Sequence, residues 1–203
     1  MPRIRAENIA AHKAMTRRQI LDSARENFLQ FGYPAVSLGD IAMDAGIGRT
    51  TLYEYFEDKE AVLIELVNDE LPTIVEHIVD GIPDGLSARE SLGELVLRHL
   101  EFISDESNLG TMIMRDSNKL SQEAQGEIRM AHGRLEQAIG DAYEAGAATG
   151  EFRAMDPAQA AELINAVTMH AARGLLRSPD PKGEVHKTTD LVLDFLFDGL
   201  GSH

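Results

Sequence analysis

Apolar side chains recur every three or four residues along almost the whole chain, and strand-like alternation is nearly absent. This spacing constrains the fold more than any other feature of the sequence, because such a chain must build its core from packed helices. The sequence therefore predicts an all-α protein. Turn and cap signals divide it into about nine helices, near residues 15–31, 38–45, 49–56, 59–79, 88–104, 109–116, 121–148, 157–177 and 184–199.

Helix starts are marked by side chains that can accept a hydrogen bond from a free backbone amide. Ser37 and Ser87 are each followed three residues later by an acidic residue, which is the spacing of a capping box. Pro72 falls inside the helix predicted at 59–79 and is expected to kink it. The other predicted caps are Asp58, Ser121, Asp156 ahead of Pro157, and Thr16 with Gln19.

The composition narrows the chemistry open to this chain. It contains no cysteine, which excludes structural disulfides and cysteine-ligated zinc or iron–sulfur sites. No run approaches the roughly 18 apolar residues of a membrane span, and the basic N-terminus lacks the apolar core of a signal peptide. We therefore expect a cytoplasmic protein with no membrane partner.

The net charge of −15 is unevenly distributed. Residues 1–60 carry eight basic and nine acidic side chains, whereas residues 61–203 carry 11 and 25. A nearly neutral first part with a basic leading edge can approach nucleic acid, while the acidic remainder is repelled by it. Charge alone leaves open an acidic protein with a basic tail. The basic residues among the first 18 are Arg3, Arg5, Lys13, Arg17 and Arg18.

The segment Gly46-Ile47-Gly48 is either part of a phosphate-binding loop or a turn between two helices. A dinucleotide fingerprint needs a third glycine, where this chain has Thr51, and a preceding strand, where this chain has a helical pattern. A tight turn explains both glycines, since Gly46 can adopt the left-handed conformation and Gly48 can cap the next helix. The pattern favours a helix–turn–helix motif at about 37–56, and an ordinary helical hairpin remains the alternative.

The second helix of this motif has one apolar side and one polar side. Leu52 and Phe56 are four residues apart and are expected to anchor it to the core. The polar side carries residue types that contact phosphates and base edges in DNA complexes. These are Arg49, Thr50, Thr51, Tyr53, Glu54 and Tyr55.

Residues 16–66 resemble the DNA-binding domain of TetR-type transcriptional regulators. The resemblance is carried by Ile20, Ala24 and Phe28 in the first helix, followed by Gly32-Tyr33. It continues through S-L-x-D-I-A at 37–42, A-G-I at 45–47, T-L-Y-x-Y-F at 51–56 and D-K-E at 58–60. The resemblance implies a three-helix DNA-binding domain at 14–60 and a helical effector-binding and dimerisation domain at 61–203.

The resemblance also implies residue roles, with the second helix of the motif lying in the major groove. Two positions depart from the family pattern. Gly48 replaces a common serine or threonine, and Thr50 replaces a common glycine. The implied base or groove-edge contacts are Arg49, Thr50, Thr51 and Glu54, and the implied phosphate or backbone contacts are Arg17, Ser37, Leu38, Gly48, Tyr53, Tyr55 and Lys59.

The C-terminal helices predict a homodimer. The helix near 157–177 is rich in alanine, and the helix near 184–199 has an apolar arc too wide for one packing surface, including Leu191, Phe195 and Phe197. A helix central to the monomer core would explain the same pattern. The indicated function is that of a ligand-responsive repressor, which binds a palindromic operator in double-stranded DNA as a homodimer.

The effector pocket has only weak sequence signals. Methionine suits adaptable apolar sites but is common in ordinary cores. Neither H-E-x-x-H nor E-x-x-H occurs, so we expect an organic effector, no metal and no cofactor. An all-α carrier or enzyme is the alternative function, although we find no catalytic constellation. The candidate pocket residues are His77, His99, Phe102, Met112, Met114, Met130, His132 and His170.

Overall fold

The computed structural model describes residues 2–105 and 109–200, and the side chains of residues 2–8 and of Leu200 lie outside that description. The charged N-terminal positions Arg3 and Arg5 therefore have a helical backbone and no described side chain. The described chain forms α1 (Pro2–Phe31), α2 (Leu38–Asp44), α3 (Arg49–Tyr53), α4 (Lys59–Asp80), α5 (Ala88–Ser104), α6 (Leu109–Asp116), α7 (Gln122–Ala131), α8 (Gly133–Thr149), α9 (Pro157–Leu175) and α10 (Pro181–Leu200), with 3-10 helices at Tyr33–Ala35 and Ser117–Lys119.

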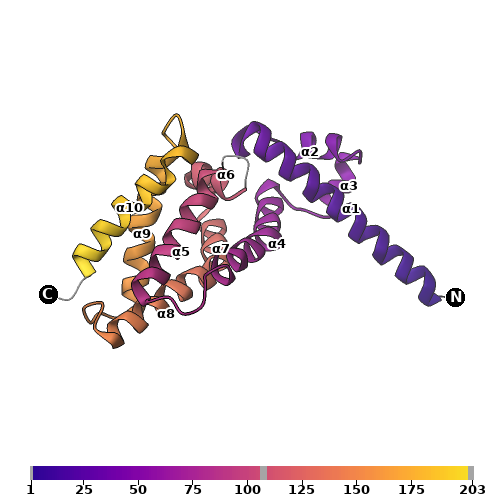
Figure 1. Cartoon of the computed structure of the whole chain (residues 1–203). Coiled ribbons are helices and arrows are strands. Elements are labelled where there is room, and N and C mark those ends of the chain that lie inside the picture. Colours follow the sequence, from indigo (N-terminus) through magenta and orange to yellow (C-terminus); the bar gives the residue numbers. More distant parts are fainter. Residues whose placement is uncertain (1, 106–108, 201–203) are drawn as a thin grey trace.

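The helices form two groups joined by α4 (Figure 1). One group contains α1, α2 and α3, and the first turns of α1 project away from the body. The other contains α5 to α10, with α10 at the opposite end of the molecule. This arrangement agrees with the predicted all-α class, while the predicted boundary between residues 60 and 61 stays a prediction.

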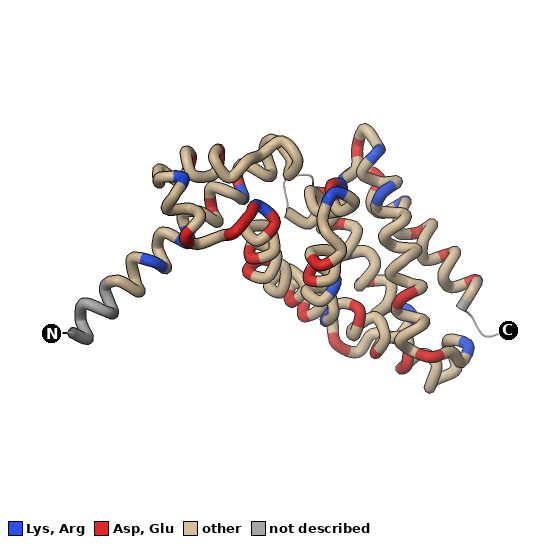
Figure 2. Tube along the Cα trace, turned by 180° about the vertical axis from the view of Figure 1, so that it is seen from behind, with Lys and Arg blue, Asp and Glu red and all other residues tan. Residues whose placement is uncertain are grey.

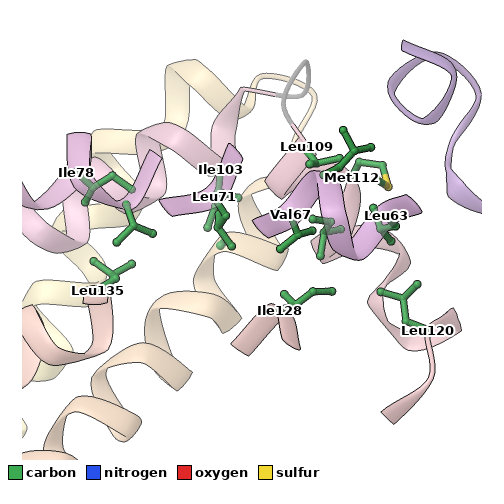
Figure 3. Packing of buried hydrophobic residues seen from close by; sticks show 14 of the residues in the cluster. Leu63, Val67, Leu71, Ile78, Ile103, Leu109, Met112, Leu120, Ile128 and Leu135 are labelled. Carbon is green, nitrogen blue, oxygen red and sulfur yellow. The ribbon is translucent and has the colours of Figure 1, made fainter. Parts of the chain in front are cut away.

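One apolar face of α4 packs against the C-terminal group, and ion pairs such as Arg18–Asp69 connect α4 to α1. Leu63, Val67 and Leu71 lie along this face and are each at most 3% exposed. Figure 3 shows their side chains meeting apolar residues of several later helices. Because α4 is shared by both groups, a tilt of this helix would move one group relative to the other. The partners labelled there are Ile103 of α5, Leu109 and Met112 of α6, Ile128 of α7 and Leu135 of α8, with Leu120 ahead of α7.

Most predicted caps are confirmed. Ser37 and Ser87 each form a complete capping box, with Asp40 and Glu90 respectively. The caps at Asp58, Ser121 and Asp156 also accept the expected amide hydrogen bonds.

The predicted box at Thr16 is wrong, because α1 begins near Pro2 and Thr16 lies inside it. The Thr16 hydroxyl instead donates to the carbonyl of His12 at 3.0 Å, the local bond that serine and threonine form inside helices.

The helix predicted at 121–148 is two helices, which makes ten α-helices in the described chain. The break falls at His132-Gly133, between α7 and α8. His132 Nδ1 lies 2.8 Å from the carbonyl oxygen of Ile128. In a continuous helix this carbonyl would accept from the backbone amide of His132, so the side chain competes for that acceptor. Arg134, just after the break, contacts Asp80 of α4 at 2.7 Å. This contact across the chain fixes the direction in which α8 leaves.

Candidate nucleic-acid interface

The turn between α2 and α3 is closed by backbone hydrogen bonds. Gly46 has φ of +67°, a value that L side chains rarely adopt. Its amide donates to Met43 at 3.2 Å, and the Ile47 amide donates to Ala42 at 3.0 Å. These paired bonds form a Schellman motif, in which the residue after the glycine makes an apolar contact. Ile47 is half-buried and packs against the core.

Leu52 and Phe56 anchor the segment that follows, as predicted. Leu52 is fully buried and Phe56 is 3% exposed. The helix itself is shorter than predicted, since α3 ends at Tyr53 and not at 56. The amides of Tyr55 and Phe56 both donate to the Leu52 carbonyl, at 2.9 and 3.1 Å. This shared acceptor closes the helix into a turn that still buries the Phe56 ring.

The side chains predicted to read DNA lie largely on the surface. Tyr53 is 49% exposed, so its ring is available to a partner without rearrangement of the core. The structure brings these side chains together on one short segment, as the spacing predicted. Arg49, Thr50, Tyr53 and Glu54 are exposed, and Thr51 and Tyr55 are half-buried.

Arg49 lies over the beginning of α2. The Arg49 guanidinium carbon is 3.9 Å from the point where a Cβ on Gly39 would stand. Hydrogen bonds from Ser37, together with the nearby Arg49 charge, hold the pKa of Asp40 below its usual range. The side chain of Leu38 is only 9% exposed. Little of this side chain is therefore accessible to a DNA backbone, and the predicted contact stays a prediction.

A buried polar cluster joins α1 to α2, and sequence patterns gave no sign of it. The Ser23 hydroxyl lies 2.7 Å from a carboxylate oxygen of Asp44, and the Asn27 amide donates to the same oxygen at 3.3 Å. Ser23 and Asn27 are at most 9% exposed. Because buried polar groups are satisfied in only one arrangement, this cluster fixes how α2 lies across α1.

Arg17 is held in place by residues of two other segments. Its guanidinium donates two hydrogen bonds to the Glu65 carboxylate of α4 and lies 4.7 Å from the centre of the Phe56 ring. The hydrogen bond to Glu65 is the main reason why the pKa of Arg17 is raised. With Glu65 as a partner, Arg17 has less free charge for a phosphate than the sequence suggested.

Lys13 was not among the predicted contacts, yet it lies beside them. Lys13 and Arg17 of α1 line a hollow of about 230 Å³ together with Glu54 and Tyr55. Lys13 is exposed and forms no ion pair within the described chain. Only the position of α1 relative to α3 reveals this neighbourhood.

Lys59 bonds to the protein itself. Its ammonium donates to the carbonyls of Tyr33 and Val36, both at 2.7 Å, and lies 4.3 Å from the centre of the Tyr33 ring. Partial burial lowers the pKa of Lys59, and the charge of Asp116 opposes that shift. An ammonium has three N–H donors, so one remains for the predicted phosphate contact.

Figure 2 shows acidic positions spread over the helices from α4 onward, and a mixture of acidic and basic positions in the group of α1 to α3. Because residues 1–60 carry nearly balanced charge, the unit formed by α1 to α3 repels DNA less than the acidic remainder of the chain does.

Two family models match the chain. Residues 20–66 match the model described as bacterial regulatory proteins of the tetR family, and residues 85–173 match the tetracyclin repressor-like C-terminal domain. Together they span both structural units. The chain belongs to the TetR family of transcriptional regulators. Members of this family are bacterial regulatory proteins.

Several TetR-family relatives can be compared with this chain. The HTH-type transcriptional repressor KstR2 of Rhodococcus jostii is 28% identical over 94% of this chain and 93% of its own length. The fatty acid metabolism regulator protein of Bacillus subtilis is 28% identical over 60% of this chain, and the match spans 66% of that relative. For the HTH-type transcriptional repressor Rv1474c of Mycobacterium tuberculosis, the match spans 53% of the relative.

Solved TetR-family structures share the fold. FadR from Bacillus subtilis in complex with stearoyl-CoA superposes with a TM-score of 0.72 at 21% identity, covering 87% of this chain and 97% of that one. A putative regulator from Saccharomonospora viridis in complex with choline gives 0.72 at 21% identity, covering 94% of this chain and 100% of that one.

The side chains predicted to line an effector pocket are dispersed in the structure. His99 is 4% exposed, and burial, with the charge of nearby His132, lowers its pKa to about 4. Met112 and Met114 line one hollow beside the DNA-binding unit. Of the predicted set, His99 and Met112 are buried, Phe102, Met114 and His132 are half-buried, and His77, Met130 and His170 are exposed.

No group of three or more histidine, aspartate or glutamate side chains within the described ranges is placed to hold a metal ion. Among the helices of residues 2–105 and 109–200, none is long and apolar enough to cross a membrane.

Proposed function

We propose that this TetR-family protein is a cytoplasmic, homodimeric repressor that binds a palindromic operator and is released from it by a small organic effector. The observation that carries the DNA contact is the exposed polar side of α3, held on the core by Leu52 and on α2 by the Gly46 turn. Arg49, Thr50 and Glu54 face the base edges, and Tyr53 and the free N–H of Lys59 face phosphates.

The dimer interface is assigned to α9 and α10. Leu163 of α9 is 54% exposed, and Leu191 and Phe195 of α10 are 70% and 66% exposed. Leu163 and Phe195 line an apolar hollow of about 600 Å³ between the two helices. Large apolar side chains left together on a surface are typical of an interface. Two copies of α9 and α10 form a four-helix contact that covers these side chains.

A two-fold dimer presents two α3 helices to successive major grooves, about 34–36 Å apart. Effector binding among α4 to α9 tilts α4, which contacts both units, and changes that spacing. One half-site can then no longer dock while the other is bound, so DNA affinity falls. Pro72 lies within α4, which continues through it as one helix, and is the place where this helix flexes.

A footprint on the DNA flanking the gene tests the proposed interface. The wild-type protein should protect a palindrome at fixed salt, and the Arg49→Ala/Tyr53→Ala variant should lose this protection. Arg18→Ala is the matched control, because Arg18 is exposed in the same domain but pairs with Asp69 of α4 at 2.8 Å. Equal protection by the wild type and the double variant would contradict the assignment of α3.

Sedimentation tests the dimer independently of DNA. The wild type should sediment as a dimer at micromolar concentration. Leu163→Asp/Phe195→Asp should sediment as a monomer, because two carboxylates would be desolvated at the centre of the contact. A wild-type monomer would overturn this part of the proposal.

A further inference from the structure

A hollow of about 450 Å³ opens where the DNA-binding unit meets the C-terminal helices. Its walls come from α1, α6 and the end of α9. Leu29, Met114 and Leu176 supply apolar surface and are half-buried. Small-molecule sites typically have about 300–1,000 Å³. In this hollow polar groups line more of the surface than apolar groups do.

Three arginines stand around this apolar surface. They are Arg115 of α6, Arg173 of α9 and Arg177 just after α9, and all three are exposed. The described lining contains no carboxylate. The guanidinium groups of Arg173 and Arg177 form no ion pair or hydrogen bond within the described chain, so their side-chain donors are free. In a protein with a net charge of −15, two unpaired guanidinium groups beside that of Arg115 attract an anion, which they bind through paired N–H donors.

We infer that this hollow is the effector site and that the effector is an organic anion, with a carboxylate or phosphate joined to an apolar group. The inference rests on the proposed function and narrows it. A larger hollow of about 860 Å³ lies between α8 and α9. Its lining contains four carboxylates and two guanidinium groups, one of them that of Arg173, which lines both hollows. The carboxylates are those of Glu136, Asp141, Glu144 and Glu162, and the second guanidinium is that of Arg129. The carboxylates outnumber the guanidinium groups in this lining, so the larger hollow favours a cation over an anion.

The position of the smaller hollow links it to DNA binding. Leu29 belongs to α1, so a bound ligand touches the helix on which α2 is fixed. A ligand in the larger hollow touches only the C-terminal helices. A ligand can shift an equilibrium only through contacts that differ between the two states. The hollow at α1 provides such contacts directly.

Arg115 supplies the switching contact. Its guanidinium is 3.8 Å from Asp116, a carboxylate whose Oδ2 is buried and has no hydrogen-bond partner within the described residues. A Cβ added to Gly32, at the end of α1, would stand 3.4 Å from the Arg115 guanidinium and 3.7 Å from Oδ2 of Asp116. An anion in the hollow competes with Asp116 for Arg115. Asp116 keeps its ion pair with Lys119 at 3.0 Å, but Oδ2 loses the only cation beside it within the described residues, which changes the packing of α6 against the end of α1.

Calorimetric titration of the DNA-free wild-type chain tests the site. Stearoyl-CoA should bind, and choline should not. Stearate and coenzyme A without an acyl chain distinguish a carboxylate from a phosphate as the recognised anion. Arg173→Gln/Arg177→Gln should weaken stearoyl-CoA binding by about tenfold or more, since it removes charge-assisted hydrogen bonds without leaving a buried charge unpaired. Lys182→Gln/Lys187→Gln is the control, because it removes the same charge from exposed lysines of α10.

A second measurement separates this inference from the proposed function. The footprint without ligand should be the same for the wild type and the arginine variant, and release by stearoyl-CoA should require about tenfold more ligand for the variant. Equal affinity of both proteins for stearoyl-CoA, no binding of any of the three anions, or tighter binding of choline would overturn the anion site. In each of these cases, a footprint on the operator would still support the repressor function. Normal anion binding without any footprint would instead reject the repressor function and leave the anion site supported.

Discussion

Replacement of Lys59 by methionine separates a structural role from a phosphate contact. The change keeps a long apolar side chain and removes the ammonium that donates to Tyr33 and Val36 at 2.7 Å. Hydrogen bonds from charged groups contribute about 1.5–3 kcal/mol each, and an exposed cation–π contact about 0.5–1 kcal/mol. Lys59 is half-buried, so water replaces part of what is lost and the desolvation cost of the ammonium also disappears.

We therefore expect the Lys59→Met variant to lose about 2 kcal/mol of unfolding free energy. For a chain of this size that loss corresponds to a fall of about 4–8 °C in Tm. Circular dichroism during heating measures it. Lys13→Met is the matched control, because it removes one lysine charge from the same domain without a carbonyl partner. Its Tm should stay within about 1 °C of the wild type.

The salt dependence of operator binding provides the second readout. If the third N–H of Lys59 contacts a phosphate, the slope of log affinity against log salt should fall by about one in Lys59→Met. A Tm equal to that of the wild type would refute the view that Lys59 stabilises the segment around Tyr33. A lower Tm with an unchanged salt slope would assign Lys59 to folding alone.

Three further perturbations follow from the structure. Gly146→Ala should cost about 1–3 kcal/mol in urea unfolding, since the added Cβ would stand 2.3 Å from the Phe152 ring. The folded pKa of His99, about 4, lies below its unfolded value, so protonation favours the unfolded chain and stability should fall as pH drops from about 6.5 to 4; chemical denaturation at several pH values should show a shallower fall in His99→Leu. Pro72→Ala should change the ligand concentration needed for operator release more than it changes ligand-free DNA affinity, and an equal release profile in the footprint would count against flexing at Pro72.

Local signals in the sequence predicted most of the helices and the helix–turn–helix motif. A capping box such as Ser37 with Asp40 involves residues three apart, and the Gly46 turn is closed by bonds within five residues. Interactions of this range depend little on the rest of the fold, so they can be recognised from the spacing of residues in the sequence. The apolar stripe that buries Leu52 and Phe56 is readable for the same reason.

Tertiary structure decided the partners of the charged side chains. Arg17 and Glu65 are 48 residues apart, and Lys59 and Tyr33 are 26 apart. Sequence periodicity indicates which side of a helix is polar, but not which polar group from another helix will lie opposite. The split between α7 and α8 was missed for the same reason, since Arg134 takes its partners from α4.

The sequence by itself therefore determined the all-α class, the two-part organisation and the helix–turn–helix motif, because these depend on periodicity and short-range hydrogen bonds. Only the tertiary structure decided which cations remain free. It paired Arg17 and satisfied most of Lys59, and it brought Arg115, Arg173 and Arg177 around one hollow from positions up to 62 residues apart. Charged side chains form a binding site only where helix packing brings them close together, and this packing depends on the whole fold.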